Sequence, residues 1–89
     1  MNVYYSSTFR KDYHDLPPET RTLAENQLAL LAENPRHPSL RVRKMRGTSW
    51  PRWEGRITRG YRFTFDWEDD SIILRRIGSH DIVDRKAKV

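Results

Sequence analysis

Cysteine and long apolar runs are both absent from the 89-residue chain. Without cysteine there is no disulfide framework, no thiolate nucleophile and no cysteine-based zinc or iron–sulfur site. The first residues lack the basic region and apolar run of a signal peptide, and no stretch approaches the roughly 18 apolar residues of a membrane-spanning helix. We therefore expect a cytoplasmic protein with no membrane partner.

Several enzyme signatures are missing as well. The chain has four glycines but no glycine-rich nucleotide loop, no HExxH helix and no serine–histidine–aspartate order. The acidic run from Asp66 to Asp70 lacks the spaced ligands and central glycine of a calcium loop. We expect no metal and no cofactor, in one small domain that spans residues 1–89.

Positive charge is concentrated in the middle of the chain. Residues 40–62 carry eight basic residues and one acidic residue, Glu54, whereas both flanking segments are close to neutral. The basic residues are Arg41, Arg43, Lys44, Arg46, Arg52, Arg56, Arg59 and Arg62. Because the planar guanidinium suits bidentate phosphate contacts, this segment favours a polyanion as partner. The alternative is a solvated basic face that only keeps the protein soluble.

Apolar spacing in the first half predicts a short strand followed by two amphipathic helices. Residues 3–5 have strand-type side chains. A serine cap at Ser6 or Ser7 starts the first helix, whose apolar residues follow at i, i+4 and i+7. The second helix begins at Pro18, which suits a first turn, and runs to about Glu33. The two helices form a hairpin.

The second half alternates with a period of two, which is typical of strands. We expect a strand or extended arm at residues 40–43 and a hairpin from residues 52–58 and 61–67, with one apolar face. The apolar run at residues 72–74 favours a central strand covered on both sides, which Gly78 ends. One short helical turn follows. The predicted fold is α+β: an N-terminal strand, a helical hairpin and a three-stranded antiparallel meander.

The hairpin register has a chemical consequence. A two-residue turn would mix the apolar and polar faces, whereas a three-residue loop at residues 58–60 keeps them apart and places Gly60 at a left-handed bulge position. That loop pairs Arg56 with Arg62, and like charges directly opposite disfavour the empty fold. The pair is therefore interpreted as a phosphate clamp. Alternatively, Glu54, Asp66 or another carboxylate neutralises it.

Three segments in order carry a family resemblance: residues 34–40 (NPRHPSL), 60–63 (GYRF) and 78–81 (GSHD). With the order of the predicted elements, they make the chain resemble the RelE/ParE superfamily of bacterial toxins over nearly its whole length. The resemblance implies a toxin of a type II toxin–antitoxin pair, which a cognate antitoxin covers. Most such toxins cleave mRNA in the ribosomal A site without a metal.

The resemblance also suggests site residues. Arg62 follows Gly-Tyr, a phosphate-binding position in the family, and His80 stands where YafQ-like ribonucleases carry a functional histidine. The gyrase-poisoning branch does not use this tail, so the histidine favours the nuclease branch. One departure is Asp84, which stands where relatives usually have an aromatic residue. Base stacking or proton transfer by that ring is therefore unaccounted for.

Metal-free RNA cleavage needs a base, an acid and stabilisation of the phosphorane. Arg56 and Arg62 stay protonated and suit the last role. An imidazole has an ordinary pKa of ~6.5, so His80 is the candidate general acid or base, or else an exposed tail histidine. Asp81 or Asp84 is the candidate for the opposite role.

The remaining basic residues are expected to position RNA, together with one tryptophan for stacking. This predicted RNA-binding set is Arg41, Arg43, Lys44, Arg46, Trp50, Arg52 and Arg59. Trp53 lies on the apolar face and is expected in the core, and His14 and His37 are expected at the surface. Two other functions stay open: a ParE-like inhibitor of DNA gyrase, and a plain RNA-binding module.

Overall fold

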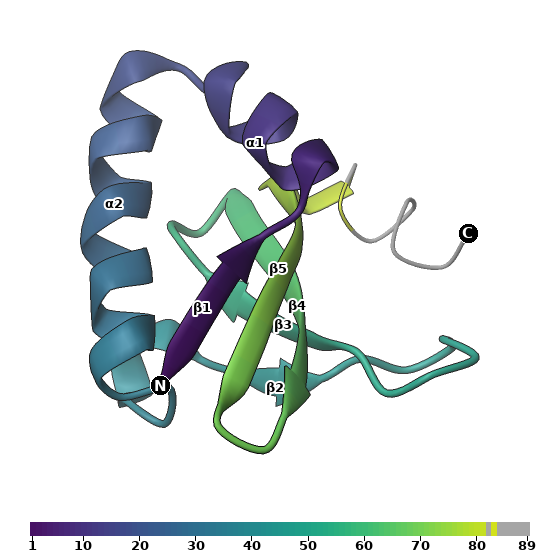
Figure 1. Ribbon diagram of the computed structural model, residues 1–89. Helices are drawn as coiled ribbons and strands as arrows, with labels where there is room; N and C mark the ends of the chain where they lie inside the picture. Colours follow the sequence, from purple (N-terminus) through teal and green to yellow (C-terminus); the bar gives the residue numbers. More distant parts are fainter. Residues whose placement is uncertain (82, 84–89) are drawn as a thin grey trace.

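The computed structural model describes residues 1–81 and 83. Its centre is a mixed five-stranded sheet in the order β1-β5-β4-β3-β2, with two helices packed against it (Figure 1). The strands are β1 (Asn2–Tyr5), β2 (Arg43–Lys44), β3 (Trp53–Arg56), β4 (Tyr61–Glu68) and β5 (Ser71–Ser79). The helices are α1 (Ser7–His14), α2 (Pro18–Glu33) and the short 3-10 helix η1 (Pro38–Leu40). β1 runs parallel to β5 and the other pairs are antiparallel, which confirms the predicted α+β fold.

Both helices begin where the sequence predicts and α2 ends at the predicted Glu33, whereas α1 ends at His14 and so leaves out Leu16, the i+7 residue of the predicted pattern. Ser6 caps α1 because its hydroxyl accepts the backbone N–H of Phe9 at 3.1 Å. Pro18 occupies the first turn of α2, where its missing N–H costs nothing. Residues of both helices, among them Phe9 and Leu31, are buried against the sheet. None of the helices formed by residues 1–81 and 83 has the length and apolar character needed to span a membrane.

The two faces of the sheet differ as predicted. Phe63 and Phe65 of β4 are fully buried on the helix-covered face, while Arg62 and Asp66 lie on the opposite, open face. The register of β4 against β5 shifts between the β4 residues Thr64 and Phe65. One extra β5 residue, Arg75, is accommodated in this bulge, so the buried set changes parity.

The polypeptide between α2 and β3 differs from the prediction. Leu40 ends a 3-10 helix instead of opening a strand, because the His37 ring accepts the Ser39 N–H and caps that turn. Arg41 then has a positive φ of 47°, which redirects the chain before the two-residue strand β2. β5 also continues through Gly78, since Ser79 still pairs with Tyr61.

The β3–β4 register is confirmed, but the predicted role of Gly60 is wrong. Gly55 lies opposite Phe63 and Arg56 lies opposite Arg62. Gly60 does not have a positive φ. The turn is held instead by Thr58, whose hydroxyl accepts the Gly60 N–H and whose carbonyl accepts the Tyr61 N–H.

Substitution by alanine should therefore affect stability differently at Gly55 and at Gly60. A Cβ at Gly55 would lie 2.3 Å from the ring of Phe63, whereas one at Gly60 meets nothing within 4 Å. We expect Gly55→Ala to destabilise the fold by about 1–3 kcal/mol through overpacking, and Gly60→Ala to change stability by less than about 0.5 kcal/mol. Urea denaturation measures both. Equal midpoints for the two variants would contradict the packing of Phe63 over Gly55.

Candidate functional site

Charged side chains on the open face lie in rows that cross the strands. In one row Arg56 of β3 is opposite Arg62 of β4, which in turn is opposite Gly78 of β5. Arg41 lies just before β2, the strand beside β3, and its charge acts on Arg56. We call Arg41, Arg56 and Arg62 the guanidinium row.

The neighbouring rows contain their own counterions. Arg43 pairs with Glu54 at 2.7 Å, and this carboxylate is only 4% exposed. One row further, the buried Arg52 pairs with Asp66 at 2.9 Å, and Arg75 lies 3.7 Å from the same carboxylate. Glu54 and Asp66 are thus engaged by other arginines of the open face.

The guanidinium row lacks such compensation. Among residues 1–81 and 83 no carboxylate forms an ion pair with Arg56 or Arg62, and the Nε atoms of both are buried without a hydrogen-bond partner. Burial, followed by the charges of Arg41, Arg62 and Arg59, lowers the pKa of Arg56. Buried donors without partners are uncommon in folded proteins, so an anion that accepts from both fits this place.

The backbone of His80 lies at the end of β5 beside this row. Its N–H donates to the carbonyl of Gly60 at 2.8 Å, directly after the pair Ser79–Tyr61. The imidazole is 43% exposed, and its Nδ1 lies 3.5 Å from Asp81. The buried Val83 lies against Gly78, so the turn that carries His80 packs at the end of the guanidinium row. Asp84 lies outside the described residues.

Solved structures with the same architecture are bacterial and archaeal toxins. YafQ from E. coli strain BL21(DE3) superposes with a TM-score of 0.76 at 16% identity over 92% of this chain and 96% of that one. RelE in the RelB–RelE complex from Methanococcus jannaschii gives 0.76 at 20% identity over 94% and 98%. A YoeB/ParE toxin from Agrobacterium tumefaciens gives 0.71 at 14% over 90% and 99%. The chain has the RelE/ParE toxin fold.

Sequence comparison adds nothing to this structural likeness, because neither the family models nor the curated proteins gave a match. The likeness covers nearly the whole chain and all five strands, so it supports the RelE/ParE fold prediction made from three short segments. At 14–20% identity it concerns architecture. The chemistry has to come from the residues.

Other predicted RNA-binding residues lie at the edge of the RelE/ParE sheet. Lys44, Arg46 and Arg59 are exposed. The β2–β3 connection extends away from the sheet (Figure 1) and carries Trp50, which is 40% exposed. Arg52 lies 4.7 Å from the Trp50 ring centre. Arg52 is buried and paired with Asp66. These contacts favour a role in which Arg52 supports the Trp50 ring and does not bind RNA directly.

Two residues near the row were missed by the sequence analysis. Arg76 lies opposite Thr64, and its Nε is 3.0 Å from Asp12 of α1. Asp12 also accepts the backbone N–H of Ile77 at 3.2 Å, so α1 holds β5 just before Gly78. The bulge at Arg75 hid Arg76, because simple alternation along β5 assigns it to the other face.

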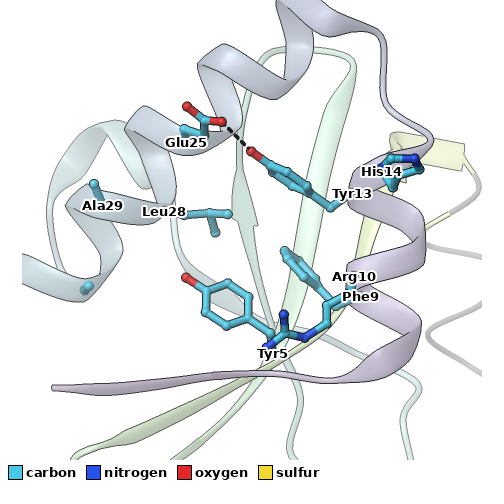
Figure 2. Close-up of a pocket in the computed structure, with 9 residues that line it drawn as sticks. Tyr5, Phe9, Arg10, Tyr13, His14, Glu25, Leu28 and Ala29 are labelled. Carbon is cyan, nitrogen blue, oxygen red and sulfur yellow. Dashed lines mark hydrogen bonds between the residues drawn. The ribbon is translucent and has the colours of Figure 1, made fainter.

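A separate groove of about 540 Å³ lies between α1 and α2 (Figure 2). Aromatic and aliphatic side chains such as Tyr5, Phe9 and Leu28 form much of its lining. Tyr13 donates to Glu25 at 2.9 Å, and burial together with this carboxylate raises the pKa of the phenol. The groove offers no counterpart to the guanidinium row, so we place the candidate site on the open face.

Matched substitutions test whether the row is uncompensated. Arg52→Gln removes the nearer of the two arginines that meet Asp66 and should lower the free energy of unfolding by roughly 1–3 kcal/mol. Arg62→Gln removes a like charge opposite Arg56 and should leave stability unchanged or raise it by up to about 1 kcal/mol. Urea unfolding at low ionic strength measures both. A similar loss in the two variants would show that Arg62 has a stabilising partner.

Proposed function

We propose that the chain is the toxin of a type II toxin–antitoxin pair and that it is an endoribonuclease that cleaves mRNA, on the ribosome and without a metal. The observation that carries this proposal is the pair Arg56 and Arg62, adjacent on the open face with buried, unpartnered Nε atoms. The RelE/ParE fold supports it, as does the position of His80 at the end of β5, where its backbone N–H donates to the carbonyl of Gly60.

The reaction follows from the groups present. The RNA 2′-hydroxyl loses its proton to a base and its oxygen bonds to the adjacent phosphorus, while the bond from phosphorus to the 5′-oxygen breaks and that oxygen gains a proton. The products are a 2′,3′-cyclic phosphate and a 5′-hydroxyl. Arg56 and Arg62 stabilise the charge that develops on the phosphorane oxygens.

His80 supplies one of the two proton transfers. Asp81 lies 3.5 Å from its Nδ1, a position from which the carboxylate can orient the ring. Asp81 or Asp84 is proposed for the other transfer. Lys44 and Arg46, both exposed, are proposed to position the RNA backbone.

An antitoxin is the proposed protein partner. The RelE from Methanococcus jannaschii was solved together with RelB, and YafQ from E. coli together with DinJ. For this chain the uncompensated row predicts an acidic or amphipathic antitoxin segment that covers the open face. Inhibition would then be competitive with RNA.

A second candidate is a ParE-like gyrase inhibitor, because one structure of the same fold is described as a YoeB/ParE toxin. This function predicts DNA breaks and arrested replication with intact mRNA. A plain RNA-binding module would instead bind with a log-log salt slope of roughly 0.7 per neutralised phosphate and cleave nothing.

Mapping new mRNA 5′ ends after expression tests the proposal. We expect the wild-type chain to generate new ends and His80→Ala or Arg62→Ala to lower their number at least ~100-fold, since each removes a group acting in the transition state. His14→Ala is the matched control, because this exposed histidine lies on α1, away from the row.

Purified protein separates the outcomes. With purified ribosomes that carry mRNA, the purified protein should cleave the message and leave 2′,3′-cyclic phosphate ends. Cleavage by both variants at the wild-type rate would disprove the site assignment, and intact mRNA with broken DNA would replace the nuclease by the gyrase inhibitor.

A further inference from the structure

A second basic cleft, of about 280 Å³, lies at the β2 edge of the sheet. The guanidinium row approaches the same edge from the open face. The walls of the cleft come from the loop after α2 and from the helix-covered face of β3 and β4. The lining residues are Pro35, Arg36, His37, Pro38, Arg41, Val42, Trp53 and Trp67. The cleft is therefore both aromatic and cationic.

Two indole rings and a guanidinium group contact one another in this cleft. The indoles of Trp53 and Trp67 meet edge to face, with ring centres 5.3 Å apart. The guanidinium of the exposed Arg36 lies over Trp67, 5.2 Å from the ring centre. A nucleobase can stack on an arginine plane as it does on an aromatic ring, so the outer side of Arg36 is a platform for a base.

The polar lining favours an anionic ligand. Arg36 and Arg41 line the cleft, and no carboxylate is among its lining residues. The Nδ1 atom of His37 accepts the Ser39 N–H at 3.2 Å, which leaves Nε2 as the atom that carries the proton in the neutral ring. A base with a phosphate attached matches an aromatic, positively charged cleft better than an apolar side chain does.

Arg41 connects the cleft to the guanidinium row. It lines the cleft, and its charge is among the causes that lower the pKa of Arg56. It comes just before β2, the edge strand of the sheet, so it is the member of the row at that edge. An RNA strand that follows the row from His80 towards β2 leaves the sheet at Arg41, where the cleft begins.

We propose that this cleft is a nucleotide subsite, in which single-stranded RNA that extends from the guanidinium row stacks one base on Arg36 and places a phosphate at Arg41. The subsite rests on the proposed action on RNA, but it binds rather than cleaves. With this subsite, the affinity for RNA depends on a nucleotide that takes no part in bond cleavage.

Fluorescence titration with adenosine 5′-monophosphate tests the subsite in the full-length chain. Trp50→Phe removes the exposed indole, so that Trp53 and Trp67 report binding. We expect AMP to quench this fluorescence, and Arg36→Ala to weaken binding roughly tenfold, the scale of losing one stacking partner. Arg36→Lys should weaken it similarly, because it keeps the charge and loses the plane.

Arg10→Ala is the matched control. Arg10 is also an exposed arginine above an aromatic ring, at 5.5 Å from the centre of Tyr5, so its loss changes the net charge equally at a distant place. AMP affinity should stay at the level of the Trp50→Phe protein. Equal affinity in the Arg36→Ala and Arg10→Ala proteins would overturn the subsite.

Cleavage assays distinguish failure of the subsite from failure of the nuclease. With mRNA on purified ribosomes, Arg36→Ala should raise KM several-fold and leave kcat unchanged, and an abasic nucleotide at the matching position of the mRNA should remove that difference. If wild type and Arg36→Ala share one KM, the nuclease stands and the subsite falls. If neither cleaves RNA nor binds AMP, both proposals fall.

Discussion

Two guanidinium groups held side by side on the open face are the constraint on which the site depends. The register of the β3–β4 hairpin places Arg56 opposite Arg62, and within the described part of the chain the buried Nε atoms of both lack hydrogen-bond partners. A like-charge pair in this arrangement opposes folding, so its energy has to come from elsewhere in the domain. The core of Phe63, Phe65 and the residues of β5 supplies it.

Arg56 and Arg62 have no counterion among the described residues because the carboxylates of the sheet are unevenly distributed. Glu54 and Asp66 stand on the same face as Arg56 and Arg62, yet Arg43 and Arg52 engage them. Each carboxylate lies in its own cross-strand row, and a neighbouring strand brings the arginine that meets it there. Counterions are thus fixed by register, which leaves positive charge at the end of the sheet nearest His80.

Local patterns made the helices and strand faces predictable, and the need to keep the apolar and polar faces of the hairpin apart gave the pairing of Arg56 with Arg62. The errors arose where a side chain decides the backbone path. The Thr58 hydroxyl fixes the turn assigned to Gly60, and the His37 ring caps a helix where a strand was expected. The remaining parts were out of reach of local patterns, because Asp12 meets Ile77 across 65 residues and the bulge at Arg75 depends on its partner strand. The pairing of Arg56 with Arg62 was therefore predicted, whereas the contacts of Asp12 and Arg76 and the Arg36 cleft were missed.

The arrangement of the charge also bears on how such a protein is controlled. An anion at the guanidinium row satisfies the two unpartnered donors and separates the like charges, whichever molecule supplies it. A phosphate of RNA and a carboxylate of a protein segment are equivalent in this respect, so the proposed substrate and the proposed antitoxin draw on the same unmet interaction. A nucleobase stacked on Arg36 is different, because the negative charge of a protein segment does not replace stacking. In this proposal the row provides affinity for any polyanion, and the cleft beside it distinguishes RNA from the inhibitor.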